Sequence, residues 1–163
     1  MGLQMWRHAR WTTPGVNLRR VLHMGSWNVL SLSEDHRLPH LSDELSRLRV
    51  DMVGLSETRR PGSGETSSKG FTYYWSVMSS GHHVKGVAIG VSSRLVPSAI
   101  EVTPVDESIM GLRLKYSLGF ISVVAVYAST EVYETEEKEM FHAKLDSVLS
   151  DFNAFTGTKN MWL

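Results

Sequence analysis

The sequence contains no cysteine, which excludes a disulfide-stabilised scaffold and any metal site built from thiolates. It also lacks a long hydrophobic run. The most apolar stretch, FISVVAVYA, is interrupted by Ser122 and is far too short to cross a bilayer. The first residues include arginines and tryptophans but not the continuous apolar segment that a secretory signal needs. An intracellular location is therefore the default expectation, without a choice between nucleus and cytoplasm.

A surplus of either charge is also missing, because the chain has 17 basic and 17 acidic residues. Net charge therefore favours neither nucleic acid nor a membrane as a partner. Locally the charge is uneven, since four basic residues precede Glu34, the first acidic one: Arg7, Arg10, Arg19 and Arg20. Such an arm could contact phosphates or simply lack structure. Pro14 and Gly15 favour the second reading, so we predict a basic irregular arm over residues 1–19 and a single domain over residues 20–163.

Residues 21–57 carry the pattern of a strand, a helix and a second strand. The segment VLHMGSWNVLSL is typical of a strand that enters a loop. In the helix, Pro39 is tolerated in the first turn, and leucines recur on one face at Leu38, Leu41, Leu45 and Leu48. The run VDMVGLSE then fits a buried strand that ends in an acid. A strand–helix–strand unit of this length predicts two parallel strands.

The rest of the chain favours short strands separated by turns. After a loop rich in glycine and serine, strands are predicted at 71–77, 86–92, 98–104, 110–116 and 120–128. Their regular spacing predicts a meander on the same sheet. A second helix follows, with acids in its first turn and an apolar face that includes Phe141, Leu145 and Val148. The predicted fold class is α/β, mainly one mixed sheet with two flanking helices.

Polar residues follow several of these apolar elements. Asn28 lies in SWNV, Glu57 in GLSETR, and Asp151 and Asn153 in SDFNA. A carboxylate at the carboxyl end of a strand faces the crevice where α/β sheets usually bind ligands. These side chains offer oxygen ligands, which Mg²⁺ prefers, usually together with waters and a phosphate oxygen. The residues alone therefore permit a Mg²⁺–phosphate site.

Structural alternatives stand beside each of these roles. Glu57 would also suit a solvated loop, where it would pair with Arg59 or Arg60. The Asp-x-Asn pattern is common as a turn or a helix stop. The aromatic run at residues 73–75 could stack on bases, but packing on alternate faces of the sheet is the simpler expectation.

The order of the motifs is more specific than any one of them. WNV, GLSETR, GVAI, VVAVYAS and DFNA follow one another as in the endonuclease/exonuclease/phosphatase superfamily. The longer segments GSWNVLSL, DMVGLSETR, GHHVKGVAIGVS and DFNAFTG resemble one branch more closely. That branch holds the apurinic-type endonuclease domains of non-LTR retrotransposons and the related craniofacial development protein 2-like proteins. The resemblance runs from about Val21 to Gly157.

The resemblance implies a role for each motif residue. Glu57 falls on the principal metal ligand and Asn28 on the residue that helps to orient it within the metal site. Tyr127 falls on the tyrosine that approaches the scissile phosphate, although it would also suit the edge of the core. Asp151 and Asn153 fall on the pair that positions the attacking water and a phosphate oxygen. The implied cofactor is Mg²⁺, with Mn²⁺ as the alternative, and the implied partner is DNA, without a membrane.

The chain also departs from the pattern of that family. The family ends with a second aspartate and a catalytic histidine, whereas the ten residues after Asn153 contain neither. Ser150 replaces the glycine before the aspartate, and the helix pattern runs directly into DFNA without an intervening apolar strand. Asp151 is therefore expected at a helix end.

From these departures we expect a truncated sandwich whose second half is missing. An uncovered apolar sheet face would favour self-association. We further expect a Mg²⁺-dependent phosphodiesterase by descent, of the DNA endonuclease type, with weak or no activity. The alternative is a catalytically dead binding module or a retrotransposon relic. A phosphatase acting on inositol lipids or nucleotides ranks below both.

Overall fold

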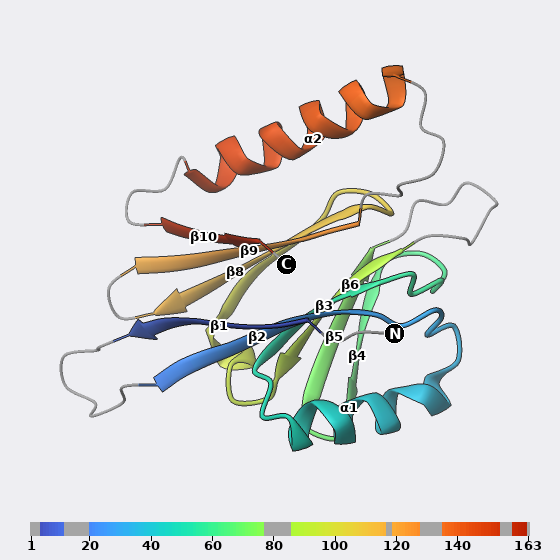
Figure 1. Cartoon of the computed structure of the whole chain (residues 1–163), viewed down its shortest axis with the longest axis vertical. Helices are drawn as coiled ribbons and strands as arrows, with labels where there is room; N and C mark the ends of the chain where they lie inside the picture. The colour runs from blue at the N-terminus through green and yellow to red at the C-terminus, as the bar shows by residue number, and fades with distance from the viewer. Residues whose placement is uncertain are drawn as a thin grey trace.

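The computed structural model describes residues 4–11, 20–76, 86–116, 119–127, 135–153 and 158–162. These residues form four layers: a helix, a six-stranded sheet, a four-stranded sheet and a second helix (Figure 1). We call the two sheets the first and the second sheet. The predicted α/β class is confirmed, but two sheets replace the single main sheet that the sequence led us to expect.

The first sheet is mixed and has the strand order β1-β2-β3-β6-β5-β4. Its strands are β1 (Gln4–Trp11), β2 (Arg20–Asn28), β3 (Met52–Ser56), β4 (Gly64–Ser68), β5 (Phe71–Ser76) and β6 (Val87–Ser92). β2 and β3 run parallel, with Asn28 opposite Ser56, and the other neighbours are antiparallel. The carboxyl ends of β2 and β3 therefore lie side by side.

The first helix, α1 (Leu38–Arg47), connects these two parallel strands and follows a short 3-10 turn, η1 (Asp35–Arg37). Proline in its first turn costs no hydrogen bond, because the first amides of a helix have no internal partner. The predicted leucine face packs on the first sheet, where Leu45 is fully buried beside Val53. The predicted strand–helix–strand unit is thus confirmed.

The second sheet has the order β10-β9-β8-β7. It comprises β7 (Ala99–Pro104), β8 (Ile109–Tyr116), β9 (Gly119–Val126) and β10 (Thr158–Trp162). The predicted strands are present, but the predicted single meander is wrong, because the chain changes sheets between β6 and β7. A short turn, η2 (Val96–Ser98), makes this crossing. The two-residue hydrophobic period shows which side of a strand is buried and cannot show to which sheet the strand belongs.

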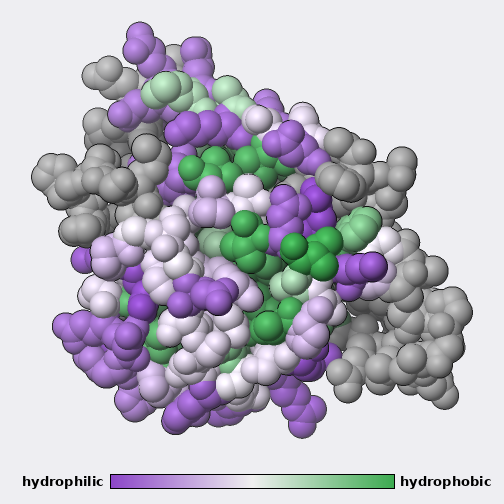
Figure 2. Space-filling view, turned by 180° about the vertical axis from the view of Figure 1, so that it is seen from behind, coloured by the Kyte–Doolittle hydropathy of each residue, from purple (hydrophilic) through white to green (hydrophobic). Residues whose placement is uncertain are grey.

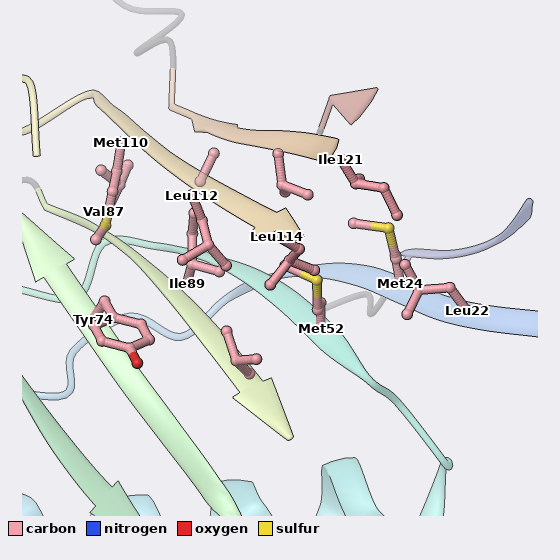
Figure 3. Packing of buried hydrophobic residues seen from close by; sticks show 13 residues of the cluster. Leu22, Met24, Met52, Tyr74, Val87, Ile89, Met110, Leu112, Leu114 and Ile121 are labelled. Carbon is pink, nitrogen blue, oxygen red and sulfur yellow. The ribbon is translucent and has the colours of Figure 1, made fainter. Parts of the chain in front are cut away.

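The two sheets bury their facing sides against each other (Figure 3). Ile89 and Met52 of the first sheet lie in one cluster with Leu112 and Val123 of the second, and each has 0% exposure. Tyr74 faces this cluster, whereas Tyr73 faces α1, as expected for alternate faces of β5. The apolar face that the sequence led us to expect uncovered is therefore covered over the described strands.

The second helix, α2 (Thr135–Asn153), covers the outer side of the second sheet. Phe141, Leu145 and Val148 contact Ile109 and Val124, which confirms the predicted apolar face. The helix continues to Asn153, and β10 follows it and pairs in parallel with β9. This last strand was not predicted from the sequence.

The predicted irregular arm over residues 1–19 is wrong in its first half, since Gln4–Trp11 form β1 and pair antiparallel with β2. Pairing satisfies the backbone groups of β2 that would otherwise form a sheet edge. Pro14 and Gly15, which suggested irregular structure, lie between the two strands, outside the described residues. The tendency of proline and glycine to interrupt regular structure therefore did not extend to the preceding residues Gln4–Trp11.

Large hydrophobic side chains are mostly buried, and among the described residues those exposed are Leu30, Ile100 and Met140. On the side turned away from the view of Figure 1, hydrophobic residues gather near the middle and hydrophilic residues surround much of them (Figure 2). Within the described chain, no helix has the length and apolar character required to span a membrane.

Candidate active site at the mouth of the sandwich

Asn28 and Glu57 meet where β2 and β3 end. Asn28 is the last residue of β2, and Glu57 directly follows β3. The Nδ2 of Asn28 donates a hydrogen bond of 2.6 Å to the Oε1 of Glu57. Parallel pairing brings the two residues to the same edge of the first sheet, as the sequence analysis anticipated.

An unusual backbone conformation directs the Glu57 side chain. Val53 and Leu55 pack against α1, so strict alternation along β3 would turn Glu57 toward the helix as well. The φ of Glu57 is +57°, in the left-handed region that residues other than glycine seldom adopt. Its carboxylate instead reaches Asn28. Asn28 lies on the same face of β2 as Met24, which packs in the core between the sheets. Such strain persists where the surrounding contacts enforce it, and it is concentrated at functional sites.

Tyr127 brings the second sheet into the site. It follows β9 directly, and its backbone N–H donates a 2.8 Å hydrogen bond to the carbonyl of Ser108. Its hydroxyl donates to the Oε1 of Glu57 at 3.0 Å, while its ring packs against the core between the sheets. The two readings of Tyr127, as a site residue and as an aromatic at the edge of the core, are therefore compatible.

The loop after β2 fixes the orientation of Asn28. The backbone N–H of Leu30 donates to the Oδ1 of Asn28 at 3.1 Å. Because this bond occupies the amide oxygen, the amide nitrogen is the atom that faces Glu57. Backbone bonds from Val29 to Ser56 and from Leu32 to Thr58 then hold the loop against the end of β3, at 3.1 and 2.7 Å.

Two arginines follow Glu57, and they have different partners. The Nη2 of Arg59 lies 3.6 Å from the Oε2 of Glu57, and 42% of the arginine side chain is exposed. Arg60 is mostly buried, stacks over the ring of Trp75 at 4.3 Å and donates to the carbonyl of Leu32 at 3.0 Å. The ion pair expected in the structural reading of Glu57 thus exists with Arg59. The anchoring role of Arg60 was not predicted from the sequence, in which the adjacent arginine pair was the only signal for it.

The structure does not bring the DFN segment to Glu57. Asp151 is exposed in the last turn of α2, and no hydrogen bond or ion pair connects it with Glu57 in the described part of the chain. The side chain of Asn153 lies outside the described residues. The expectation that Asp151 lies at a helix end agrees with this placement, whereas the roles drawn from the resemblance for Asp151 and Asn153 stay predictions.

The donor set fits a hard cation with few protein ligands. Among the described residues no group of three or more His, Cys, Asp or Glu side chains could surround an ion. Mg²⁺ does not need such a cage, because it usually binds through one or two carboxylates and keeps waters and phosphate oxygens as its other ligands. The Oε1 of Glu57 accepts two hydrogen bonds, whereas among the described residues its Oε2 has the longer contact with Arg59 alone. One carboxylate oxygen of Glu57 would therefore suit a cation of this kind.

Comparison with known proteins gives one pair of sequence relatives. No family model matches the chain. It is similar to craniofacial development protein 2 of Tragulus javanicus and of Bos taurus, at 28% identity over 126 residues in each case. The match covers 77% of this chain but 22% and 21% of the two relatives, so the chain spans about a fifth of their length.

Solved structures of nucleases and a phosphatase share the fold. AP endonuclease LMAP from Leishmania major matches with a TM-score of 0.60 and 13% identity, over 90% of this chain and 52% of that one. The endonuclease domain of TRAS1, a telomere-specific non-LTR retrotransposon, gives 0.57 and 13%, over 80% and 54%. The 3′ phosphatase NExo from Neisseria, bound to a product DNA hairpin, gives 0.54 and 19%, over 85% and 56%.

At these identities the structural likeness concerns the fold alone. The chain thus has the fold of the endonuclease/exonuclease/phosphatase superfamily and is similar in sequence to craniofacial development protein 2, as the order of its motifs predicted.

Proposed function

We propose that the chain is a metal-dependent phosphodiesterase of the DNA endonuclease type, with Glu57 as its principal metal ligand. One observation carries this proposal: the Glu57 carboxylate is held by Asn28 from the first sheet and by Tyr127 from the second. A glutamate in a solvated loop would need neither a strained backbone nor two hydrogen-bond donors to the same carboxylate oxygen. The DNA-acting proteins that share the fold support the choice of substrate class.

In this proposal each side chain has a task that its geometry allows. Asn28 and Tyr127 would fix the carboxylate by hydrogen bonds to Oε1, so that Oε2, which lies 3.6 Å from Arg59, is the oxygen proposed to bind the cation. Mg²⁺, when bound, would supply neutralisation of the charge on the phosphoryl oxygens. Arg59, partly exposed beside Glu57, would place a guanidinium near a phosphate of the substrate. Asp151 and Asn153 are proposed, from the resemblance alone, to position the attacking water.

A plasmid-nicking assay tests the proposed function. Supercoiled DNA is incubated with the purified chain in the presence of Mg²⁺, Mn²⁺, or EDTA. Conversion to the open circle with either cation, and its loss in EDTA, is the expected result. Absence of nicking from a folded sample at every metal concentration would refute the catalytic claim.

A second candidate function is a catalytically inactive module that binds nucleic acid. The specific observation in its favour is the exposed position of Asp151 in α2, without contact to Glu57. This candidate predicts DNA binding without cleavage, measured as a fluorescence anisotropy change on labelled duplex DNA under the conditions of the nicking assay. Nicking that depends on metal would exclude it.

A further inference from the structure

A cleft lies at the opposite end of the first sheet from Glu57. Its volume is about 710 Å³, and it is bordered by the end of α1, the start of β3 and the end of β6. Asp51, which lines it, precedes β3, whereas Glu57 follows the same strand six positions later. At roughly 3.3 Å per strand residue the two sites are about 20 Å apart. The cleft is therefore separate from the candidate active site.

Two guanidinium groups line this cleft, and within the described part of the chain one of them, that of Arg94, is paired. Arg94 donates from Nε to the Oδ1 of Asp51 at 2.8 Å, and its Nη2 contacts the same carboxylate. Asp51 is buried and also accepts a 2.9 Å bond from the backbone N–H of His23. The Arg49 side chain is exposed, and no ion pair or hydrogen bond of its guanidinium occurs in the described part of the chain. Two arginines and one aspartate among the lining residues leave a formal charge of about +1 in the cleft.

The lining also includes serine hydroxyls, one of which has no partner among the described residues. The Oγ of Ser92 is buried and has no hydrogen-bond partner among the described residues. Ser46 and Ser93 also border the cleft. The backbone N–H groups of Ser92 and Ser93 are already engaged with the carbonyls of Asp51 and Gly70, at 2.9 and 2.8 Å. A buried hydroxyl without a partner in a polar cleft calls for a ligand or a water that would satisfy it.

The negative groups near the cleft are paired within the protein or carry little charge. Asp51 is neutralised by Arg94, and the carboxyl end of α1 carries only about half a negative charge. One carbonyl at this end, that of Arg49, is occupied by the Nδ1 of His23 at 2.9 Å. The surplus of donors and of positive charge therefore remains available to an anion.

We propose that this cleft binds a phosphate group. A planar guanidinium oriented by a buried carboxylate presents its remaining N–H groups in a fixed direction, which suits the oxygens of a phosphate. Arg49 supplies a second charge and the serines supply hydroxyl donors, whereas a carboxylate ligand would use fewer of these groups. The phosphate could belong to a free phosphate compound or to a nucleic acid, and the two sources share the same recognition chemistry.

The test measures phosphate binding in the Glu57→Gln background, so that cleavage plays no part in the readout. Inorganic phosphate and pyrophosphate are titrated while backbone amide signals are followed by NMR. Arg49→Asn is the main variant, because asparagine tolerates the positive φ of 55° at this position. Ser92→Ala is the second variant. Arg47→Gln is the matched control, since Arg47 is a nearby arginine of α1 that pairs with Glu44.

We expect saturable shifts at residues 92–94 and about tenfold weaker binding in Arg49→Asn, as the loss of a charge-assisted contact implies. Ser92→Ala should weaken binding as well, and Arg47→Gln should leave it within about twofold. A short single-stranded oligonucleotide that displaces pyrophosphate identifies nucleic acid as the source, whereas one that does not displace it identifies a free phosphate compound. No saturable shift at the cleft, or equal weakening by Arg49→Asn and Arg47→Gln, would overturn the proposal.

Discussion

At the scale of single residues, Glu57 combines a functional geometry with a conformational cost. Its left-handed backbone turns the carboxylate away from α1 and toward two donors. A non-glycine residue in such a conformation costs on the order of 1–3 kcal/mol. The hydrogen bonds from Asn28 and Tyr127 offset part of that cost. A residue selected for stability alone would have been glycine or asparagine here.

A pair of substitutions isolates the backbone contribution at Glu57. Glu57→Ala and Glu57→Gly both remove the carboxylate, but only glycine relieves the positive φ. We expect Glu57→Gly to be more stable than Glu57→Ala by about 1 kcal/mol, measured by urea unfolding. If the alanine variant were equally stable, the φ of +57° would not describe this position.

Tyr127 allows the hydroxyl to be separated from the ring. Tyr127→Phe keeps the packing against the core and removes the 3.0 Å bond to Glu57. Since one hydrogen bond to a charged group contributes about 1.5–3 kcal/mol, we expect nicking to fall roughly 10- to 100-fold in rate. The unfolding midpoint should change far less than in Tyr127→Ala. An unchanged nicking rate would remove Tyr127 from the site.

At the scale of elements, α1 is fastened to the first sheet through a buried polar contact. The hydroxyls of Ser42 and Tyr73 lie 2.7 Å apart, and Ser42 has 0% exposure. The Ser42 hydroxyl oxygen also lies 2.9 Å from the carbonyl oxygens of both Leu38 and Ser68, to which its proton can be donated. Burial raises the pKa of the Tyr73 phenol to about 12, and the bond to Ser42 lowers it by less. The helix therefore depends on a tyrosine that keeps its proton.

This pKa predicts how stability responds to alkaline pH. The unfolded chain loses the Tyr73 proton near pH 10, whereas the folded chain keeps it to about pH 12, so the contribution is present below pH 10 and is lost between these values. The free energy of unfolding should fall by roughly 1.4 kcal/mol per pH unit in that window. Tyr73→Phe should flatten this slope in urea unfolding measured at several pH values. An identical slope in the variant would contradict the account.

Elements were predictable where the pattern is local. The leucine spacing determined α1, and the apolar run before Glu57 determined β3, because both depend on the period of one element. The division of the later strands between two sheets was not predictable, since β6 and β8 have the same kind of buried pattern. β1 was missed because Pro14 and Gly15 were taken to describe the residues before them. For the site, the residue at the end of β3 was predictable, but the backbone turn that aims Glu57 was not.

At the scale of the whole molecule, the candidate active site exists only where both sheets meet. Glu57 and Asn28 belong to the first sheet, and Tyr127 belongs to the second. The core between the sheets sets the distance from the tyrosine hydroxyl to the carboxylate. Packing in the centre of the sandwich therefore affects the geometry of the site at the carboxyl ends of β2, β3 and β9.

A cavity in that core tests the dependence on packing. Leu112 lies between the sheets with 0% exposure, and Leu112→Ala should cost about 2–5 kcal/mol of stability by urea unfolding. Leu112→Met nearly conserves volume and should cost less than about 1.5 kcal/mol. Equal costs for the two variants would mean that the sheets are not closely packed at this position.

The measurement that tests the central claim most directly is plasmid nicking by Glu57→Gln beside a matched control. Glutamine keeps the size of the side chain and removes the charge that a cation needs, while Glu65→Gln removes an exposed carboxylate from β4 of the same sheet. We predict that metal-dependent nicking falls at least about 100-fold in Glu57→Gln, the loss expected when a metal ligand is removed. Nicking should persist in Glu65→Gln. Equal nicking by the wild type and both variants would show that the activity does not arise at Glu57 and would contradict the account.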